Sequence, residues 1–438
     1  MIERRGWTPL DAPWPNVSIV SLVKVLLVTL YFPPAGGGGV QRPLKFATHL
    51  PGLGIETHVL APDDPKWIHR DDDLPAPSLA WVHRIRFIGP AGRKPAEELH
   101  GTMGLDRYVR QASLLGRRLL VPDENVSFNL TAIPAAIRII KQEGIDVVIT
   151  TSPPGSIHFV GAAAQRQTGV RWVADLRDSL VAHPHRDSSK LAVRVKEQGL
   201  HAVAALVAKK ADAIVAVSDA IAGEMRSRSP RGPVLTIPNG SDFDDFAGLE
   251  YHPSRDLFRI THSGSFFGKR DPRPFLTALA QVDGVVARFV GDFRSTDREW
   301  AAGIADRIEL IPYAPHRRAL ELQRDSEALL LLIPEAGGRG RGVLSGKVYE
   351  YLAARRPILA VVPPDGAAAE LLRETGAGVV VAPDDIDGIA RELSALRDRF
   401  RAGTLNDTVL DDAGRDRVSR RARMREFADL LLGLERVS

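Results

Sequence analysis

The residues with the clearest chemical potential lie between positions 337 and 359, in the stretch GGRGRGVLSGKVYEYLAARRPIL. A glycine-rich loop comes first, and Ser345 then stands where a helix would begin, with Lys347 and Glu350 in its first turns. Glycines let backbone N–H groups approach an anion closely, a helix N-terminus adds positive potential, and basic side chains strengthen both for a phosphate. Glu350 can accept hydrogen bonds from vicinal hydroxyls such as those of a ribose. The stretch therefore indicates a nucleotide or nucleotide-sugar site, against the alternative of a plain surface loop and an amphipathic helix.

Other turns with similar potential follow predicted strands. Four glycines at 36–39 come after one apolar run, and the turn GSFFGKR at 264–270, with Lys269 and Arg270 at its end, comes after another. A third polar turn, DLRD, follows the strand predicted at 171–174. The carboxyl ends of parallel strands face the ligand crevice in open α/β sheets, so these turns are expected to converge.

The elements that must position these turns alternate regularly between apolar runs and helical patterns, which is typical of an α/β fold with parallel sheets. A strand at 23–30 and a helix at 40–49 open one unit, and a strand at 258–262 and a helix at 272–279 open another. The sequence therefore predicts two Rossmann-like doubly wound domains that face a cleft. The expected organisation is a loose extension at 1–22, an N-terminal domain at 23–240, a linker at 241–255, a C-terminal domain at 256–414, and a helix at 415–438 that packs back on the N-terminal domain.

Composition narrows the function classes. The 438 residues contain no cysteine, which excludes disulfides, thiolate metal sites and a cysteine nucleophile, and suits a cytoplasmic location. The net charge is only +4 and the arginines are spread along the chain, so anionic small molecules or lipid headgroups are favoured as partners over nucleic acid. Residues 104–120 can form a helix with an arginine-rich face and a leucine face, which fits either a solvated surface or peripheral association with the inner membrane surface. Oligomeric state stays open.

Six segments, taken in order, resemble GT-B glycosyltransferases of the family 4 type: VLLVTLYFPPAGGGGVQRPLKFATHL, SPPGSIHFVG, WVADLRDS, IPNGSD, HSGSFFGKRDP and SGKVYEYLAARRPIL. The resemblance implies a retaining transferase that uses a nucleoside-diphosphate sugar, either UDP-, GDP- or dTDP-linked, and needs no metal or other cofactor. It places the donor mainly on the C-terminal domain. The acceptor, a hydroxyl of a glycan, lipid-linked glycan or secondary metabolite, lies mainly on the N-terminal one.

The resemblance also assigns roles residue by residue. Lys269 and Arg270 match the basic position after the first strand of the C-terminal domain and are expected to stabilise the departing diphosphate. Asp175 falls where many relatives carry a histidine near the reacting sugar, although an aspartate–arginine pair that fixes a loop is the structural alternative. The expected site residues are catalytic Asp175, Lys269 and Arg270; donor-binding Gly37, Gly38, Gly39, Gly264, Ser265, Glu335, Ser345, Lys347 and Glu350; and acceptor-side His158, Arg177 and Asp178.

One departure from the family concerns a pair of glutamates with seven residues between them. Gly342 stands eight positions before Glu350, so the first glutamate is missing. Glu335 lies upstream and is the candidate to replace it.

Other classes of protein match parts of this sequence. A dinucleotide oxidoreductase is disfavoured because Gln41 stands where the third glycine of G-x-G-x-x-G should be. Aspartate pairs at 71–73 and 242–244 fit the pattern of a one-domain GT-A transferase, but they lie in polar loops of a chain with two α/β halves. A GT-B epimerase or hydrolase of nucleotide-sugars and an inactive sugar-nucleotide-binding subunit stay open. Turnover without an acceptor would indicate the first, and donor binding without transfer the second.

Overall fold

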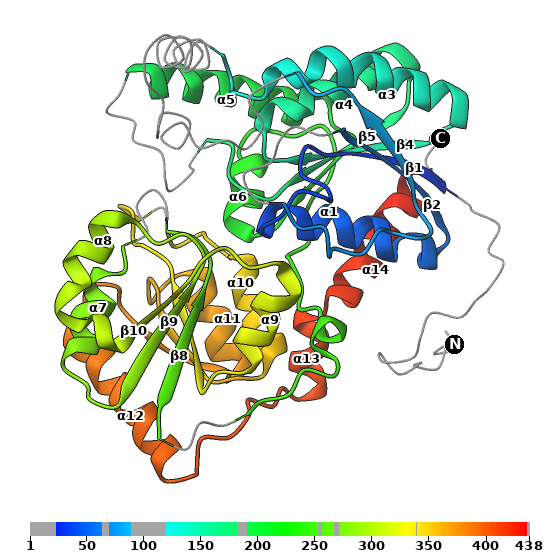
Figure 1. Cartoon of the computed structure of the whole chain (residues 1–438). Helices are drawn as coiled ribbons and strands as arrows, with labels where there is room; N and C mark the ends of the chain where they lie inside the picture. The colour runs from blue at the N-terminus through cyan, green and yellow to red at the C-terminus, as the bar shows by residue number, and fades with distance from the viewer. Residues whose placement is uncertain are drawn as a thin grey trace, which may run out of the picture.

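The computed structural model describes residues 23–63, 70–88, 120–181, 191–252, 256–266, 271–338 and 340–435, which form two domains (Figure 1). The extension at 1–22, the helix expected at 104–120, and Lys269 and Arg270 lie outside the described residues. Within the described ranges, no helix is both long and apolar enough to cross a membrane.

The first domain is built on a parallel sheet of seven strands in the order β3-β2-β1-β4-β5-β6-β7. Its central strands, β1, β4, β5 and β6, are buried along almost their whole length, as expected for parallel strands that are covered on both faces. The strands are β1 (Val23–Val28), β2 (Ile55–Pro62), β3 (Trp81–Ile85), β4 (Val147–Ser152), β5 (Arg171–Leu176), β6 (Ala213–Ala216) and β7 (Val234–Thr236).

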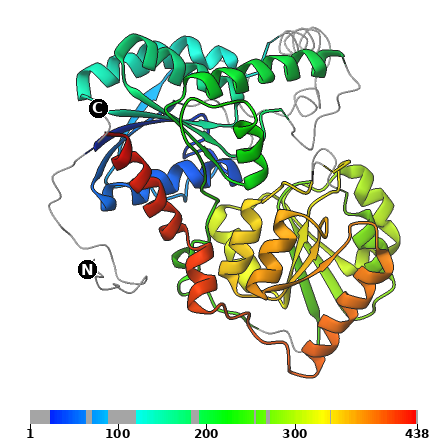
Figure 2. The same ribbon diagram turned by 180° about the vertical axis from the view of Figure 1, so that it is seen from behind.

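Helices cover both faces of this sheet. One face packs against the helices α3 (Asn129–Glu143), α4 (His158–Thr168), α5 (Leu191–Lys210) and α6 (Asp219–Arg226). The other face packs against α1 (Gly38–His49) and, from the far end of the chain, α14 (Arg420–Glu435). The rings of Phe46 and Phe427 lie with centroids 4.5 Å apart between these two helices. The last helix thus completes the core of the first domain, as the view from behind shows (Figure 2).

The second domain repeats the plan with six parallel strands in the order β10-β9-β8-β11-β12-β13. The strands are β8 (Phe258–Ser263), β9 (Val285–Val290), β10 (Ile308–Ile311), β11 (Ala328–Leu332), β12 (Ile358–Val361) and β13 (Gly378–Val381). One face packs against α7 (Arg273–Ala280) and α12 (Ile386–Arg401), and the other against α10 (Gly346–Ala354) and α11 (Ala367–Thr375). The remaining helices of this region are α8 (Ser295–Trp300), α9 (His316–Arg324) and α13 (Asp412–Val418).

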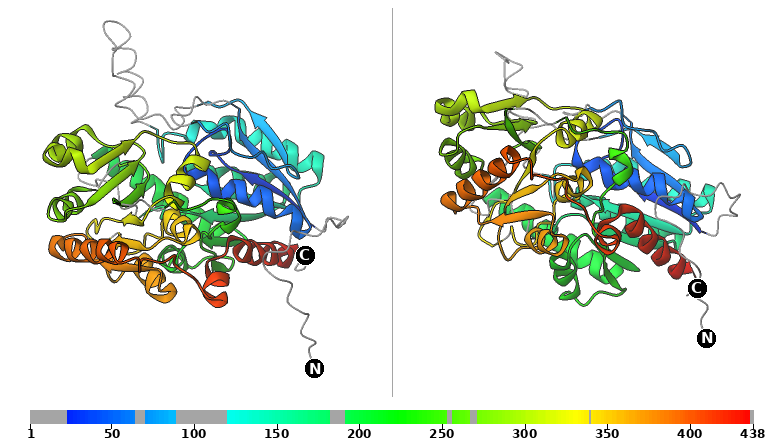
Figure 3. Two further views of the ribbon diagram at one scale, coloured as in Figure 1. Left: turned by 60° about the horizontal axis from the view of Figure 1, so that its bottom comes forward. Right: turned by 90° about the horizontal axis from the view of Figure 1, so that it is seen from below.

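The chain crosses between the domains at two places that lie side by side. Ser241 and Ser419 form a parallel bridge. The Ser241 N–H donates to the Val418 carbonyl at 2.6 Å, and the Arg420 N–H donates to the Ser241 carbonyl at 3.0 Å. The second crossing joins α13 to α14 and can be followed in Figure 3.

The two-sheet α/β architecture predicted from the sequence is confirmed, with small changes at the ends of elements. The strand expected at 23–30 ends at Val28, and α1 begins at Gly38 instead of Val40. The segment expected to be a plain linker, 241–255, contains a short 3-10 helix, η5 (Phe243–Phe246). Phe243 and Phe246 pack against the core of the second domain. The segment is too short for a periodic pattern of apolar residues to predict this contact from the sequence.

Candidate active site

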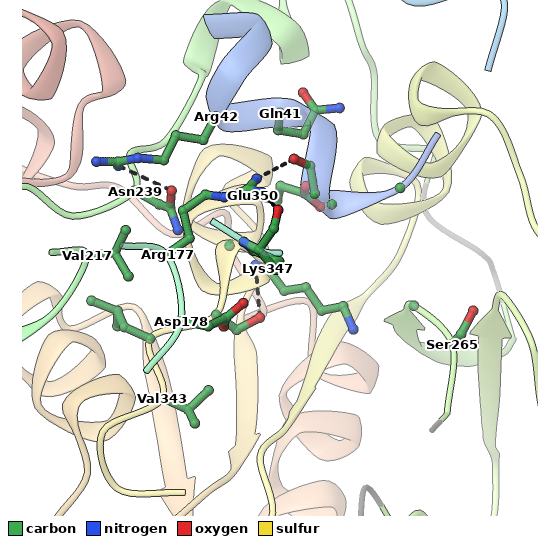
Figure 4. A pocket seen from close by; sticks show the side chains of 18 of the residues that line it. Gln41, Arg42, Arg177, Asp178, Val217, Asn239, Ser265, Val343, Lys347 and Glu350 are labelled. Atoms are coloured by element: carbon green, nitrogen blue, oxygen red, sulfur yellow. Dashed lines mark hydrogen bonds between the residues drawn. The ribbon is translucent and has the colours of Figure 1, made fainter. Parts of the chain in front are cut away.

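A cavity of about 890 Å³ lies between the domains, where the carboxyl ends of both sheets face each other. Turns that follow β1, β4, β5, β6 and β7 line it from the first domain, and turns that follow β8, β9, β10 and β11 line it from the second. In each sheet the strand order reverses at the first strand, β1 or β8, and ligands of open α/β sheets bind at such reversals. Figure 4 shows side chains of both domains pointing into this space.

The glycine loop of the first domain presents the N-terminus of α1 to the cavity. Gly37, Gly38 and Gly39 all line it, and Gly37 has a φ of +87°, a conformation that favours glycine. No acidic residue lies in the first turn of α1, so the positive potential of this helix end is not offset locally.

The second domain presents the N-terminus of α10 to the same cavity. Ser345 lines it and caps the helix by accepting a hydrogen bond from the Lys347 N–H at 3.4 Å. The Lys347 side chain crosses directly over Gly264, which has a φ of +133°, and a Cβ placed at Gly264 would lie 2.1 Å from the lysine Nζ. Only glycine fits there, because it tolerates that conformation and leaves the path of the lysine open.

The turn after β8 is fixed by a reciprocal pair of hydrogen bonds. The Ser265 hydroxyl donates to an Asp292 carboxylate oxygen at 3.0 Å and accepts from the Asp292 N–H at 3.1 Å. Gly264 and Ser265 both line the cavity. Lys269 and Arg270 follow in the sequence but lie outside the described residues.

Glu350 faces the cavity from the second turn of α10. One of its carboxylate oxygens accepts from the Gln323 amide at 3.1 Å, which orients the carboxylate. His316, at the start of α9, lines the cavity nearby. Burial lowers the pKa of His316, but its contact with Asp245 at 3.7 Å and the charge of Glu350 outweigh burial and leave that pKa above its ordinary value.

Arg177 joins the turns of the first domain. Its guanidinium donates to the Ser152 carbonyl at 2.6 Å, to the Pro153 carbonyl at 3.4 Å and to the Gly39 carbonyl. Burial lowers the pKa of Arg177 from its ordinary value, against the opposing charges of nearby carboxylates. Asp178 lines the cavity beside it. Arg177 therefore fixes the glycine loop against the ends of β4 and β5.

Three of the residues expected in the site do not line the cavity. Asp175 is fully buried, and its oxygens accept from Arg42 at 2.8 to 3.1 Å and from the Thr151 hydroxyl at 2.7 Å. His158 is fully buried beside Thr150, at 2.9 Å. Glu335 lies at the surface, 3.3 Å from Arg341. The geometry of Asp175 is that of an aspartate–arginine pair that fixes a loop, with Arg42 as the arginine.

The sequence interpretation overlooked residues that the fold brings to the cavity. Tyr313 follows β10, and Ala220 and Glu224 lie on α6 after β6. The rule that strand ends face the crevice would have pointed to Tyr313. Arg42 of α1 also lines the cavity. The feature of the sequence that could have indicated this role is a charged residue on the buried face of a predicted helix.

Comparisons with known proteins agree with this geometry. Residues 37–240 match the family model described as a glycosyl transferase 4-like domain. Sucrose-phosphate synthase from Thermosynechococcus elongatus is similar, with a TM-score of 0.66 and 16% identity over 95% of this chain and 100% of that one. HepE from Anabaena, solved in complex with UDP and glucose, has a TM-score of 0.60 and 15% identity over 93% of this chain and 99% of that one.

The fold also extends to another activity. A putative UDP-N-acetylglucosamine 2-epimerase from Listeria monocytogenes has a TM-score of 0.53 and 13% identity over 94% of this chain and 97% of that one. A comparison with the sequences of curated proteins gave no match.

The two facing α/β domains have the GT-B fold, as the resemblance implied. Residues 37–240 therefore belong to a glycosyl transferase 4-like domain, and the two domains together share the fold of the solved glycosyltransferases named above.

Proposed function

We propose that the chain transfers a glycosyl group from a nucleoside-diphosphate sugar to a hydroxyl of an acceptor, with retention of configuration at the anomeric carbon. The observation that carries this proposal is the cavity between the carboxyl ends of two parallel sheets, with one helix N-terminus reaching it from each domain. Such helix ends bind phosphate through their N–H groups and their positive potential.

The diphosphate is the part of the donor that this arrangement suits best. As the glycosidic bond breaks, the leaving group gains negative charge, and groups that are already oriented toward that charge accelerate the step. The α10 N-terminus, Lys347 and the turn at Gly264 and Ser265 supply such groups from the second domain. The glycine loop supplies N–H groups from the first. We propose that Lys269 and Arg270 add positive charge from the same turn as Gly264.

Glu350 is proposed to hold the ribose hydroxyls of the donor. Its carboxylate faces the cavity and accepts from Gln323 through one oxygen. A carboxylate has acceptor sites for further donors, so a diol can bind beside the amide. Because HepE has been solved with UDP and with UDP-glucose, UDP-sugars are the first donors to test.

The acceptor is proposed to bind on the side of the first domain, near Arg177 and Asp178. In a retaining transfer the departing phosphate can take the proton of the acceptor hydroxyl, so the reaction needs no strong protein base. Asp175 and His158 are then assigned to positioning the turns that end β5 and β4, since both are fully buried. Because helix N-termini and basic side chains can stabilise the charge of the leaving diphosphate, we also propose that transfer needs no metal ion.

The test is a screen of UDP-, GDP- and dTDP-sugars for thermal stabilisation, because a ligand that binds only the folded chain raises its apparent stability by mass action. We expect donors with one base to raise the melting temperature in a saturable way. The stabilising donor is then assayed for transfer to neutral glycans, lipid-linked glycans and glycosides, with and without EDTA, and the anomer formed is read by NMR.

The outcomes separate the alternatives. Transfer with retention that persists in EDTA supports the proposal. An isomerised sugar or free sugar formed at the full rate without an acceptor would instead indicate an epimerase or hydrolase. Failure of all three donor classes to stabilise the chain would contradict nucleotide-sugar binding.

A further inference from the structure

Asp71 lies in the turn before β3, in the first domain, and is only 2% exposed. One of its carboxylate oxygens accepts from the His316 N–H of the second domain at 2.6 Å, and the other accepts from the Asp73 N–H at 3.2 Å. Each oxygen of this buried carboxylate therefore accepts a hydrogen bond from a backbone N–H, one in each domain. The side chain of a helix N-cap accepts from backbone N–H groups in the same way.

The helix that receives this contact lacks a cap of its own. Pro315 occupies the N-cap position of α9, no side chain of the helix accepts from its first turn, and that turn contains no acidic residue. Ser, Thr, Asp or Asn usually supplies this acceptor from the preceding position. Asp71 supplies it across the domain interface instead.

The same segment also holds the glycine loop. The Asp71 N–H donates to the Pro34 carbonyl at 2.9 Å, and the adjacent residues Ala35 and Arg70 form an antiparallel bridge. On the opposite side, the Tyr313 hydroxyl accepts from the Gly37 N–H. The loop before α1 is therefore tied to the segment before α9 at two points.

We propose that Asp71 is a positioning residue that fastens the glycine loop of the first domain to the start of α9 in the second, and so sets the width of the donor cavity. This inference rests on the proposed function, because the two segments that Asp71 joins carry Gly37, Tyr313 and His316, which line that cavity. Asp71 itself does not line it and touches no substrate.

The neighbouring aspartate provides a matched control. Asp72 is 68% exposed and pairs only with Arg70, at 2.9 Å, among the contacts described for it. Of the three aspartates at 71–73, Asp71 is therefore buried in the interface, and Asp72 and Asp73 are exposed.

The experiment compares Asp71→Ala, Asp71→Asn and Asp72→Ala. We measure the Kd of UDP-glucose, or of the GDP- or dTDP-sugar that stabilises the wild-type chain, and the radius of gyration in solution without ligand. We expect Asp71→Ala to weaken donor binding about tenfold, the size of effect seen when a helix cap is lost, and to enlarge the radius of gyration. Asp71→Asn should stay within about threefold of wild type, because its amide oxygen still accepts from the His316 N–H. Asp72→Ala should behave as wild type.

Two results would overturn the inference: a wild-type Kd and radius of gyration for Asp71→Ala, or an asparagine variant as impaired as the alanine variant. A role in folding alone would lower the melting temperature and leave both readouts unchanged. If Asp71→Ala does not fold, Tyr313→Phe, which removes the acceptor for the Gly37 N–H, must shift both readouts in the same direction. If no nucleotide-sugar binds the wild-type chain, the proposed function fails, and the radius of gyration still decides the role of Asp71.

Discussion

Lys347 reaches the cavity through a path that glycine alone leaves open at position 264. We expect Lys347→Ala to lower the transfer rate by ~10²-fold or more, as is typical when one charge-stabilising group is lost from a transition state. The measurement is kcat/KM with the donor that the thermal screen identifies. Lys141→Ala, which changes an exposed lysine of α3, is the matched control.

Gly264→Ala tests the same contact from the other side. The added methyl group would displace the lysine and strain the turn, so it should impair transfer although it removes no charged group. Wild-type rates for both Lys347→Ala and Gly264→Ala would contradict the role of Lys347.

Because the imidazole of His158 is buried, we expect the free energy of unfolding to depend on pH. Burial lowers the pKa of its imidazole to about 4. In the unfolded chain the imidazole is protonated below its ordinary pKa of 6.5, whereas in the folded chain it is protonated only below about pH 4. The free energy of unfolding therefore decreases as the pH falls from 6.5 to about 4. Between pH 7 and pH 5 the loss is about 2 kcal/mol by linkage.

The measurement is the free energy of unfolding in urea at pH 7 and pH 5, for the wild type and for His158→Gln. The variant should lose about 2 kcal/mol less than the wild type over this interval. Equal losses for the two proteins would show that His158 does not titrate as described.

At the scale of elements, α14 packs as part of the first domain although the whole second domain separates them in the sequence. Phe427 is fully buried, with its ring against Phe46 of α1. We expect Phe427→Ala to lower the free energy of unfolding by about 3 to 5 kcal/mol, as when a large side chain leaves a core cavity. Urea unfolding measures this, with the exposed neighbour Asp429→Ala as control. A cost below about 1 kcal/mol would mean that the helix only rests on the surface.

Much of this arrangement of elements was predictable from local patterns. Runs such as 213–216 and 328–332 are apolar throughout, and a strand that is buried on both faces favours that composition whatever its partners are. The glycine loop at 36–39 could be placed at the crevice because it follows a strand, and Lys347 and Glu350 because they follow a glycine-rich loop at the start of a helix. The arginine-rich sequence of α14 predicts a helix but does not by itself identify the domain on which it packs.

Contacts between distant residues could not be predicted in this way. Asp175 stands at a strand end, as a catalytic residue would, but its partner Arg42 is 133 positions away and its burial depends on the packed fold. The cap that Asp71 supplies to α9 joins residues 245 positions apart. Neither pairing has a signature in spacing or composition.

At the scale of the whole molecule, Gly342 of the second domain lies close to α6 of the first domain, where its lack of a side chain leaves room for that approach. A Cβ placed at Gly342 would lie 2.9 Å from the Ala220 Cβ of α6, closer than such atoms approach in folded proteins. The glutamate that the resemblance led us to expect in this position therefore does not fit between the domains as they stand.

A double substitution tests this. Gly342→Ala should raise the donor KM about fivefold by holding the domains apart, and the further change Ala220→Gly should restore it, because contacting residues show coupling of this size. Gly303→Ala, whose added methyl group meets no atom within 4 Å, is the control. Additive effects of the two changes on KM would contradict the steric explanation.

The paired crossings at Ser241 and Ser419 have a consequence for motion. Because the two crossings are hydrogen-bonded to each other, rotation of one alone would break those bonds, and we expect any swing of one domain over the other to follow a single axis. A lone linker would allow twisting and sliding as well. We therefore expect the residues that line the cavity from the two domains to return to the same alignment after each swing, without a ligand to set it.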